Sequence, residues 1–149
     1  MKTNHNRILV PSNGSKACED AFRWACHLAK RSKSELHSIY ISEIPFKYPL
    51  NSEYELANSD GELILSRIEN IAAEEKYKVQ AQLLKARQAG PAIVLEAANR
   101  NMDMIIIGIP YKQPNAPRNI GSTTSYLLDH AQCELILWRE PTLSDILRN

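Results

Sequence analysis

The sequence lacks long apolar runs and lacks an excess of charge of one sign. No apolar stretch approaches the roughly 20 residues that span a bilayer, which excludes a transmembrane helix. The 149 residues carry a formal net charge of only +1, too little for the whole surface to attract nucleic acid or an anionic membrane. Residues 1–6 are polar and show no secretory signal. We therefore expect a cytoplasmic protein that binds neither nucleic acid nor a membrane.

Cysteine, histidine and glycine are also scarce. Cys18, Cys26 and Cys133 are odd in number and lack the spacing of a metal site, so reduced thiols are expected. The four histidines lack the helical or hairpin spacing that zinc sites use. The five glycines form no GxGxxG, Walker or GxSxG pattern. These absences argue against a metal centre and against nucleophilic catalysis, and we expect no catalytic residue.

The chain does contain a regular alternation of strand and helix patterns. Its composition, 44% hydrophobic and 23% charged, is that of an ordinary globular protein, and its length suits a single domain over residues 1–149. Short apolar runs predict strands at residues 7–10, 35–41, 79–84, 102–107 and 135–138. Helical periodicity occupies the intervals, beginning after Ser15, near residue 62, at Gly90-Pro91 and at Ser122.

This alternation favours parallel strands joined by right-handed helical crossovers. We predict an α/β fold, with a doubly wound five-stranded parallel sheet of strand order 3-2-1-4-5 and helices on both faces. In that order the first and fourth strands are neighbours at the switch point, and the loops that follow them frame a ligand crevice.

Two helices have apolar stripes that we expect to face the sheet. In the first helix the stripe consists of Ala17, Ala21, Trp24, Ala25 and Leu28. In the second it consists of Leu63, Ile64, Ile68, Ile71 and Ala72. Between the second strand and the second helix, residues 42–61 show no periodicity and contain two prolines, so we expect a long loop there.

The stretch from Ile105 to Ser122 has the features of an anion site. A buried strand runs into Gly108, a proline-containing loop follows, and Gly121-Ser122 begins the next helical pattern. The first N–H groups of a helix have no partner inside the helix and carry partial positive charge, which suits a phosphate. This stretch therefore predicts a phosphate-binding loop.

Residues 8–15, Gly108, Gly121-Ser122 and residues 130–133 together resemble the universal stress protein family over nearly the whole chain. Members typically have V-P-x-D-G-S at the first turn and G-x-x-G, nine residues, then G-S/T near the end. Here Gly108 fits, residues 109–110 are the two spacers and residues 112–120 are the nine. Tyr111 stands in place of the second glycine.

The resemblance implies the fold predicted above, of the adenine nucleotide α-hydrolase type, and a site for ATP or AMP, with or without magnesium. It implies that the first turn meets the ribose and adenine, that the end of the second strand offers backbone groups to adenine, and that the glycine loop and the next helix hold the phosphates. The implied binding residues are Pro11, Ser12, Asn13, Ile41, Gly108, Ile109, Gly121, Ser122 and Thr123.

The chain departs from the family pattern at two places. Asn13 replaces an aspartate, which removes a charge and keeps the capacity to hydrogen-bond a ribose hydroxyl. Pro110 has no N–H to donate, and Tyr111 carries a Cβ that disfavours positive φ. Lys112 and Arg118 are cations in the same loop that can attract a phosphate.

Two functional hypotheses follow from the resemblance. The first is a stress-response or regulatory protein that binds an adenine nucleotide without efficient catalysis. The second is a protein–protein interaction module of the same fold that binds no nucleotide. An enzyme of the α-hydrolase type is disfavoured, because residues 12–15 lack the aspartate and second glycine of its loop. We also expect a homodimer through the last strand, since an apolar edge strand needs a partner. Its residues are Leu135, Ile136, Leu137 and Trp138.

Overall fold

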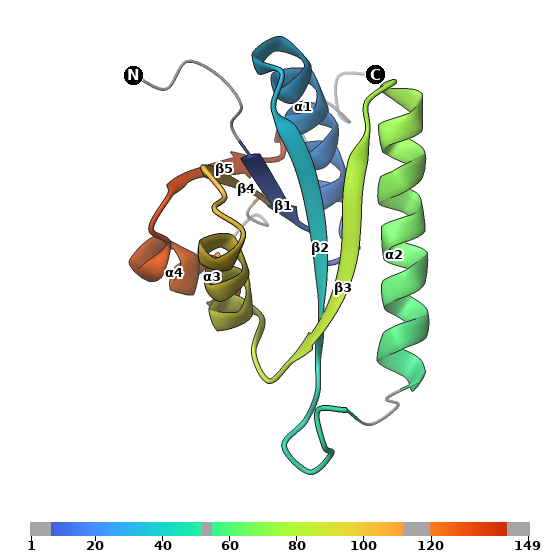
Figure 1. The fold of residues 1–149 in the computed structure, drawn as a ribbon, viewed down its shortest axis with the longest axis vertical. Coiled ribbons are helices and arrows are strands. Elements are labelled where there is room, and N and C mark those ends of the chain that lie inside the picture. The colour runs from blue at the N-terminus through green and yellow to red at the C-terminus, as the bar shows by residue number, and fades with distance from the viewer. Residues whose placement is uncertain (1–6, 52–54, 112–119, 143–149) are drawn as a thin grey trace.

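The computed structural model describes residues 7–51, 55–111 and 120–142, with the side chains of 55–59 left aside. Strands and helices alternate along the described chain, as Figure 1 shows. In order they are β1 (Arg7–Pro11), α1 (Lys16–Ser32), β2 (Glu35–Glu43), α2 (Glu55–Glu74), β3 (Val79–Ala86), α3 (Ala89–Asn99), β4 (Met104–Ile109), α4 (Ser122–His130) and β5 (Glu134–Arg139).

The five strands form one parallel sheet of order β3-β2-β1-β4-β5, which confirms the predicted strand order. Helices α1 and α2 cover one face, and α3 and α4 cover the other (Figure 1). Alternate residues of β1 point to opposite faces of the sheet. Ile8 and Val10 pack beneath α1, whereas Leu9 packs beneath α3 and α4. The core is therefore two apolar layers separated by the sheet.

Helix α1 faces the sheet with a stripe rotated from the predicted one. Trp24 is 40% exposed, so its predicted burial was wrong, and Phe22 is fully buried in its stead. Small side chains line the rest of the buried face and allow the helix to lie close to β1 and β4. The buried residues are Ala17, Cys18, Ala21, Phe22, Ala25, Cys26 and Ala29. Leu63 of α2 was likewise predicted inside and is 63% exposed.

Helix α2 begins at Glu55, inside the segment that the sequence predicted to be a loop. The prediction failed at Gly61, which usually weakens a helix. Here the glycine serves packing, because a Cβ on Gly61 would lie 2.4 Å from Leu83 Cδ1 and 2.8 Å from the ring of Tyr40. The absence of a side chain lets α2 approach β2 and β3 closely.

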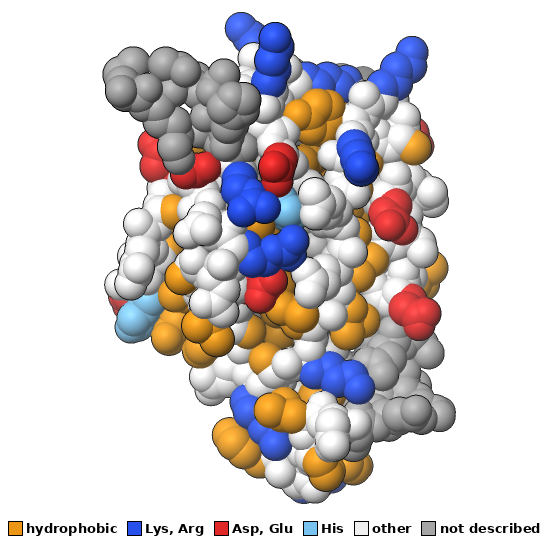
Figure 2. Space-filling view, in the orientation of Figure 1, with side chains coloured by type: hydrophobic (Ala, Val, Ile, Leu, Met, Phe, Trp, Pro, Cys, Tyr) orange, Lys and Arg blue, Asp and Glu red, His pale blue; other side chains and the backbone are white. Residues whose placement is uncertain are grey.

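Residues 44–51 form a projecting tip after β2, which lies at the bottom of Figure 2. Phe46 is 82% exposed there, with the Arg87 guanidinium 5.0 Å from its ring centroid. Arg87 Nη1 also donates to the carbonyl oxygens of Pro45 and Tyr48, both at 2.8 Å, and so holds the tip in place. Among the helices of the described chain, none is long and apolar enough to cross a membrane.

Candidate nucleotide site

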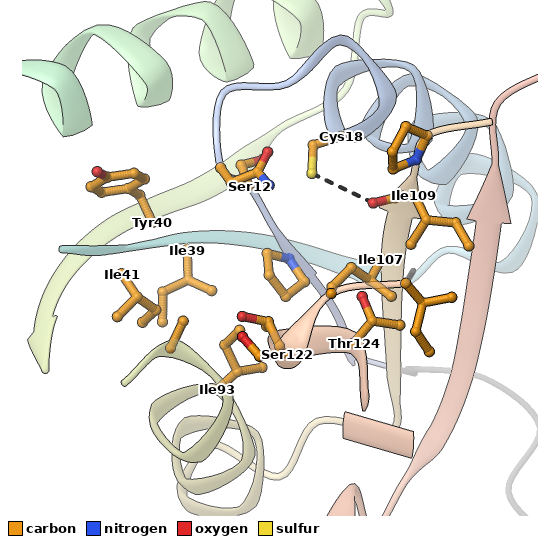
Figure 3. A pocket seen from close by; sticks show the side chains of 18 residues that line it. Ser12, Cys18, Ile39, Tyr40, Ile41, Ile93, Ile107, Ile109, Ser122 and Thr124 are labelled. Atoms are coloured by element: carbon orange, nitrogen blue, oxygen red, sulfur yellow. Dashed lines mark hydrogen bonds between the residues drawn. The ribbon is translucent and has the colours of Figure 1, made fainter. Parts of the chain in front are cut away.

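A pocket of about 410 Å³ opens where β1 and β4 end, within the size range of small-molecule sites. It lies at the switch point of the sheet, between the turn after β1 and the start of α4 (Figure 3). The structure brings all of the sequence-predicted binding residues to its wall. They are Pro11, Ser12, Asn13, Ile41, Gly108, Ile109, Gly121, Ser122 and Thr123.

The turn after β1 is fixed by hydrogen bonds of its own. Ser12 N donates to Ile39 O at 2.9 Å, and Ser38 Oγ donates to Val10 O at 2.8 Å beneath it. Asn13 Oδ1 accepts from Ser15 N at 2.9 Å, an Asx turn that leads into the N-cap of α1. The Asn13 amide NH₂ is therefore the donor that this side chain can offer to a hydroxyl in the pocket.

The apolar side of the pocket belongs to the core layer on the α3 and α4 face of the sheet. Ile39 and Ile41 of β2 face Ile93 of α3, and Ile107 belongs to the same buried cluster (Figure 3). These side chains form an apolar surface of the kind that an aromatic base prefers. Tyr40 projects to the opposite side of β2, and burial raises the pKa of its phenol, with Asp60 and Glu43 adding to the rise.

Ile41 also presents its backbone to the pocket. Because Ile39 O accepts from Ser12 N, the backbone groups of Ile39 are directed toward β1. Residues two apart on a strand direct their N–H and C=O to the same side. Strand β1 ends at Pro11, opposite Ile39, so the N–H and C=O of Ile41 face the pocket beyond that end.

Helix α4 supplies the polar wall. Gly121 is its N-cap at φ +88°, a conformation that favours glycine, and it has no side chain to cap the helix. Ser125 N donates to Gly121 O at 3.0 Å, so the N–H groups of Ser122, Thr123 and Thr124 precede the first bond of the helix. Together with their hydroxyls they form a cluster of donors at the positive end of the helix dipole.

The structure explains the glycine at position 108 by helix packing, whereas the predicted phosphate loop explained it by phosphate binding. A Cβ at Gly108 would lie 2.3 Å from the carbonyl oxygen of Ala17 and 2.9 Å from Ala21 Cβ. The thiol of Cys18 donates to Gly108 O at 3.8 Å (Figure 3). Helix α1 therefore packs directly on the backbone of β4, and this contact alone requires a glycine.

The two residues that directly follow β4 offer no free N–H of their own to the pocket. Pro110 lines the pocket and has no N–H, and Tyr111 is absent from its lining. Tyr111 N donates instead to Glu140 Oε1 at 3.1 Å, and Glu140 N donates to Ile109 O at 3.0 Å. The Arg139 guanidinium lies 4.9 Å from the ring centroid of Tyr111. Lys112 and Arg118, the two predicted phosphate-attracting cations, lie outside the described residues.

Sequence reasoning missed several residues of the pocket, among them Cys18, Thr124 and Ala89. Thr124 directly follows the predicted Ser122-Thr123 pair, and its place in the first turn of α4 was a usable signal. Cys18 lies one turn after its N-cap Ser15, whose Oγ accepts from Cys18 N at 3.1 Å. Ala89 comes from the start of α3, which no local pattern connects to the pocket.

No lysine, arginine, aspartate or glutamate of the described chain lines this pocket. The described residues also contain no group of three or more histidine, cysteine, aspartate or glutamate side chains that could hold a metal ion. A neighbouring cavity shares Ala89, Ser122 and Thr123 with the pocket and has Glu43 and Arg87 on its wall. Glu43 Oε2 accepts from Ala89 N at 2.8 Å and thus caps α3. The polar chemistry of the pocket is therefore that of uncharged donors.

This arrangement, a parallel sheet of order 3-2-1-4-5 with a pocket at the switch point, is that of a doubly wound α/β protein. The model of the universal stress protein family matches residues 4–139, and the chain belongs to this family. A universal stress protein of Methanocaldococcus jannaschii is 24% identical over 143 residues, covering 92% of this chain and 84% of that protein.

Two solved structures show the same fold. One is a universal stress protein family protein of Arabidopsis thaliana with AMP bound, 15% identical with a TM-score of 0.70, covering 93% of this chain and 94% of that one. The other is the universal stress protein of Archaeoglobus fulgidus in complex with dAMP, also 15% identical with a TM-score of 0.70, covering 91% and 98%. These TM-scores show a shared fold.

Proposed function

We propose that the pocket binds an adenine nucleotide and that the protein acts as a regulatory or stress-response protein without efficient catalysis. The observation that carries the proposal is one cavity of about 410 Å³ with an apolar isoleucine wall on one side and the N-terminus of α4 on the other. A nucleotide has the same division, with a flat apolar base at one end and an anion at the other.

The pocket residues divide among the parts of the ligand. The base would lie against Ile39, Ile41 and Ile93, with the backbone of Ile41 offering one donor and one acceptor to its edge. The ribose would lie near Ser12 and the Asn13 amide. A phosphate would accept hydrogen bonds from the first turn of α4, at Ser122 and Thr123.

Structures of related proteins support this proposal. Proteins of the same fold were solved with AMP and with dAMP, both adenine nucleotides with one phosphate. Magnesium would reach the site only with the nucleotide, since no described side chain on the pocket wall is a carboxylate. A cytoplasmic location stays a prediction from the sequence.

The test is equilibrium binding of AMP, followed by calorimetry and by the shift in melting temperature at millimolar AMP. The diagnostic variant is Ser122→Asp, which places a carboxylate where the phosphate would lie and at the same time favours the helix dipole. We expect AMP affinity to fall at least about tenfold, since losing one charge-assisted hydrogen bond costs about 1.5–3 kcal/mol. The melting temperature without ligand should not fall.

The matched control is Ser125→Asp, which adds the same charge to α4 at an exposed position that does not line the pocket. Its AMP affinity should stay within about twofold of the unmodified protein, because an exposed charge is largely screened. Unmodified protein that shows neither binding nor a melting shift at millimolar AMP would overturn the proposal.

A second candidate function is a protein–protein interaction module that binds no nucleotide. The observation that favours it is the end of β4, where Tyr111 donates its N–H to Glu140 at 3.1 Å and Pro110 has none. The absence of AMP binding in the test above would favour this alternative.

We also propose that the chain forms a homodimer through β5. This strand is at the edge of the sheet and pairs only with β4 among the described strands. Leu137 is 37% exposed on it, whereas Trp138 and Ile136 pack partly against the core beneath α1. An edge strand with apolar side chains is a template for pairing with a second copy.

A further inference from the structure

A second cavity lies beside the nucleotide pocket and shares part of its wall. Its volume is about 410 Å³, like that of the nucleotide pocket. The shared residues are Ala89, Ser122 and Thr123. Under the proposed function Ser122 and Thr123 hold the phosphate, so the phosphate lies at the boundary between the two cavities. A group that is joined to this phosphate can therefore occupy the second cavity while the nucleotide stays in the first.

The second cavity has charged side chains, which the described wall of the nucleotide pocket lacks. Glu43 is the last residue of β2, and Arg87 directly follows β3. Gln88 and Tyr126 add an amide and a phenol to the same wall. The two cavities therefore suit different parts of one ligand. The second suits a group that carries both an anion and hydrogen-bond donors.

Arg87 is held in place through only one of its nitrogens. Its Nη1 donates to the carbonyl oxygens of Pro45 and Tyr48, both at 2.8 Å, and to that of Ile44 at 3.3 Å. Within the described chain, Nε and Nη2 make no hydrogen bond. These two nitrogens form the edge of a guanidinium that binds a phosphate through two parallel hydrogen bonds. Arg87 thus offers a positioned donor pair to an anion.

Glu43 is held in the same way through one oxygen. Its Oε2 accepts from Ala89 N at 2.8 Å, which fixes the carboxylate at the start of α3. Its Oε1 makes no hydrogen bond within the described chain, and an ionised carboxylate can only accept. Hydroxyl groups of a sugar can donate to it, whereas a further ionised phosphate would add negative charge without a proton to donate. The wall therefore favours a sugar that is joined to a phosphate.

We infer that the second cavity binds a sugar phosphate joined to the phosphate of the adenine nucleotide, so that the ligand is an adenosine diphosphate that carries a sugar. The inference rests on the proposed function and names the ligand class of that site more closely. The AMP portion occupies the nucleotide pocket, with its phosphate at Ser122 and Thr123. The second phosphate accepts from Nε and Nη2 of Arg87, and the sugar hydroxyls donate to Glu43.

The experiment compares the binding of AMP, ADP and ADP-ribose to the full chain by calorimetry. ADP-ribose should bind at least about tenfold more tightly than AMP, since one charge-assisted hydrogen bond corresponds to about that factor. ADP should lie between them, because its second phosphate can reach Arg87 but has no hydroxyl to donate to Glu43. AMP should displace ADP-ribose in competition, because both occupy the nucleotide pocket.

The first variant is Arg87→Lys, which keeps the positive charge and a donor for the carbonyl oxygens of the tip but loses the paired edge. ADP-ribose affinity should fall about tenfold, and AMP affinity should stay within about twofold of its original value. The matched control is Arg100→Lys at the C-cap of α3, the same substitution at a residue that lines neither cavity. It should change neither affinity.

The second variant is Glu43→Gln, whose amide oxygen can still accept from Ala89 N. It removes the carboxylate that the sugar hydroxyls would use. The preference for ADP-ribose over ADP should therefore shrink several-fold, whereas AMP affinity should change less than twofold. An unchanged preference would overturn the assignment of the sugar to Glu43.

Equal affinities for AMP and ADP-ribose in the unmodified protein would overturn the inference and leave the proposed function standing. Equal losses of ADP-ribose affinity in Arg87→Lys and Arg100→Lys would also overturn it. Absence of binding for all three ligands would contradict the proposed function, and the inference would fall with it. The comparison of the three ligands needs no variant, so it remains decisive even if Arg87→Lys melts too early to be measured.

Discussion

Each of two walls of the pocket contains a glycine, Gly121 at the start of α4 and Gly108 in β4, and the two glycines have different structural roles. At the α4 wall, Gly121 adopts a positive φ of +88° and a Cβ there would have nothing within 4 Å. At the β4 wall, a Cβ on Gly108 would lie 2.3 Å from Ala17 O, so its role is to let α1 pack on β4. One glycine shapes the α4 wall of the pocket, and the other is a packing residue that borders the same pocket.

The different roles of the two glycines explain why this chain keeps Gly108 of the family's glycine pattern and has Tyr111 in place of the next glycine. The contact of Gly108 with α1 is needed for the fold whether or not a phosphate binds. Tyr111 does not line the pocket, and its N–H donates to the carboxylate of Glu140. Gly108 is therefore evidence for the fold, whereas Gly121 and Ser122 are the part of the pattern that bears on a ligand.

The largest effect that would test this comparison is on stability. Gly108→Ala should lower the free energy of unfolding by about 3 kcal/mol, because the added methyl would overlap a backbone carbonyl that cannot move without shifting α1. Urea denaturation followed by circular dichroism measures this change. Gly121→Ala is the matched substitution, with an expected cost of about 1–2 kcal/mol from the backbone conformation alone, at φ +88° and ψ 156°.

Equal losses for the two alanine variants would break the comparison. A smaller loss for Gly108→Ala than for Gly121→Ala would mean that α1 does not lie as close to β4 as the structure shows.

The next effect in size is on assembly. Leu137→Lys places a charge on the exposed edge of β5 and should weaken the proposed dimer at least about tenfold, since burying an unpaired charge is costly. Light scattering should then give the 16.9 kDa of one chain where the unmodified protein gives twice that mass. Because β5 borders only the β4 wall, AMP affinity should change less than twofold.

The control for assembly is Leu128→Lys, where the side chain is 52% exposed and belongs to α4, not to the edge strand. Its mass should match that of the unmodified protein. An unmodified protein that already has the mass of one chain at micromolar concentration would contradict the dimer proposal.

The smallest effect concerns pH and lies away from both walls. His37 is 1% exposed near the start of β2, and its Nδ1 has no hydrogen-bond partner among the described residues. Burial lowers the pKa of His37 below its usual value, although the nearby Glu35 opposes the shift. The unfolded chain therefore binds more protons as pH falls from about 6.5, so stability should decrease as pH falls through that window.

Melting temperatures between pH 7.5 and 5.5 measure this effect. In His37→Gln the dependence should be weaker than in the unmodified protein. AMP affinity at pH 7.5 should be the same in both, because His37 does not line the pocket. A steeper dependence in the variant would show that another group controls it.

Most of the fold was predictable from local patterns. Apolar runs marked the strands, and the alternation with helices gave the strand order that the sheet shows. The wrong predictions share a cause: whether a side chain is buried depends on the element that packs against it, which local patterns do not show. Trp24 and Leu63 occupy helical positions that sequence periodicity assigns to the core, yet both are exposed. In α1, small residues and Phe22 fill the contact with the sheet. Gly61 resembles a helix stop and is instead a point of close packing.

What the sequence determined by itself was the part of the pocket formed by the ends of β1, β2 and β4 and the start of α4. Parallel strands bring their carboxyl ends to one edge, and a helix that starts after a glycine exposes its first N–H groups. What only the tertiary structure decided was the hydrogen-bond partner of the Tyr111 N–H at the end of β4. The bond between Tyr111 and Glu140 joins positions 29 residues apart. It depends on the register of β4 with β5, which pairs Ile109 with Arg139 and so brings Glu140 to the end of the strand. No local pattern encodes a contact that strand register creates.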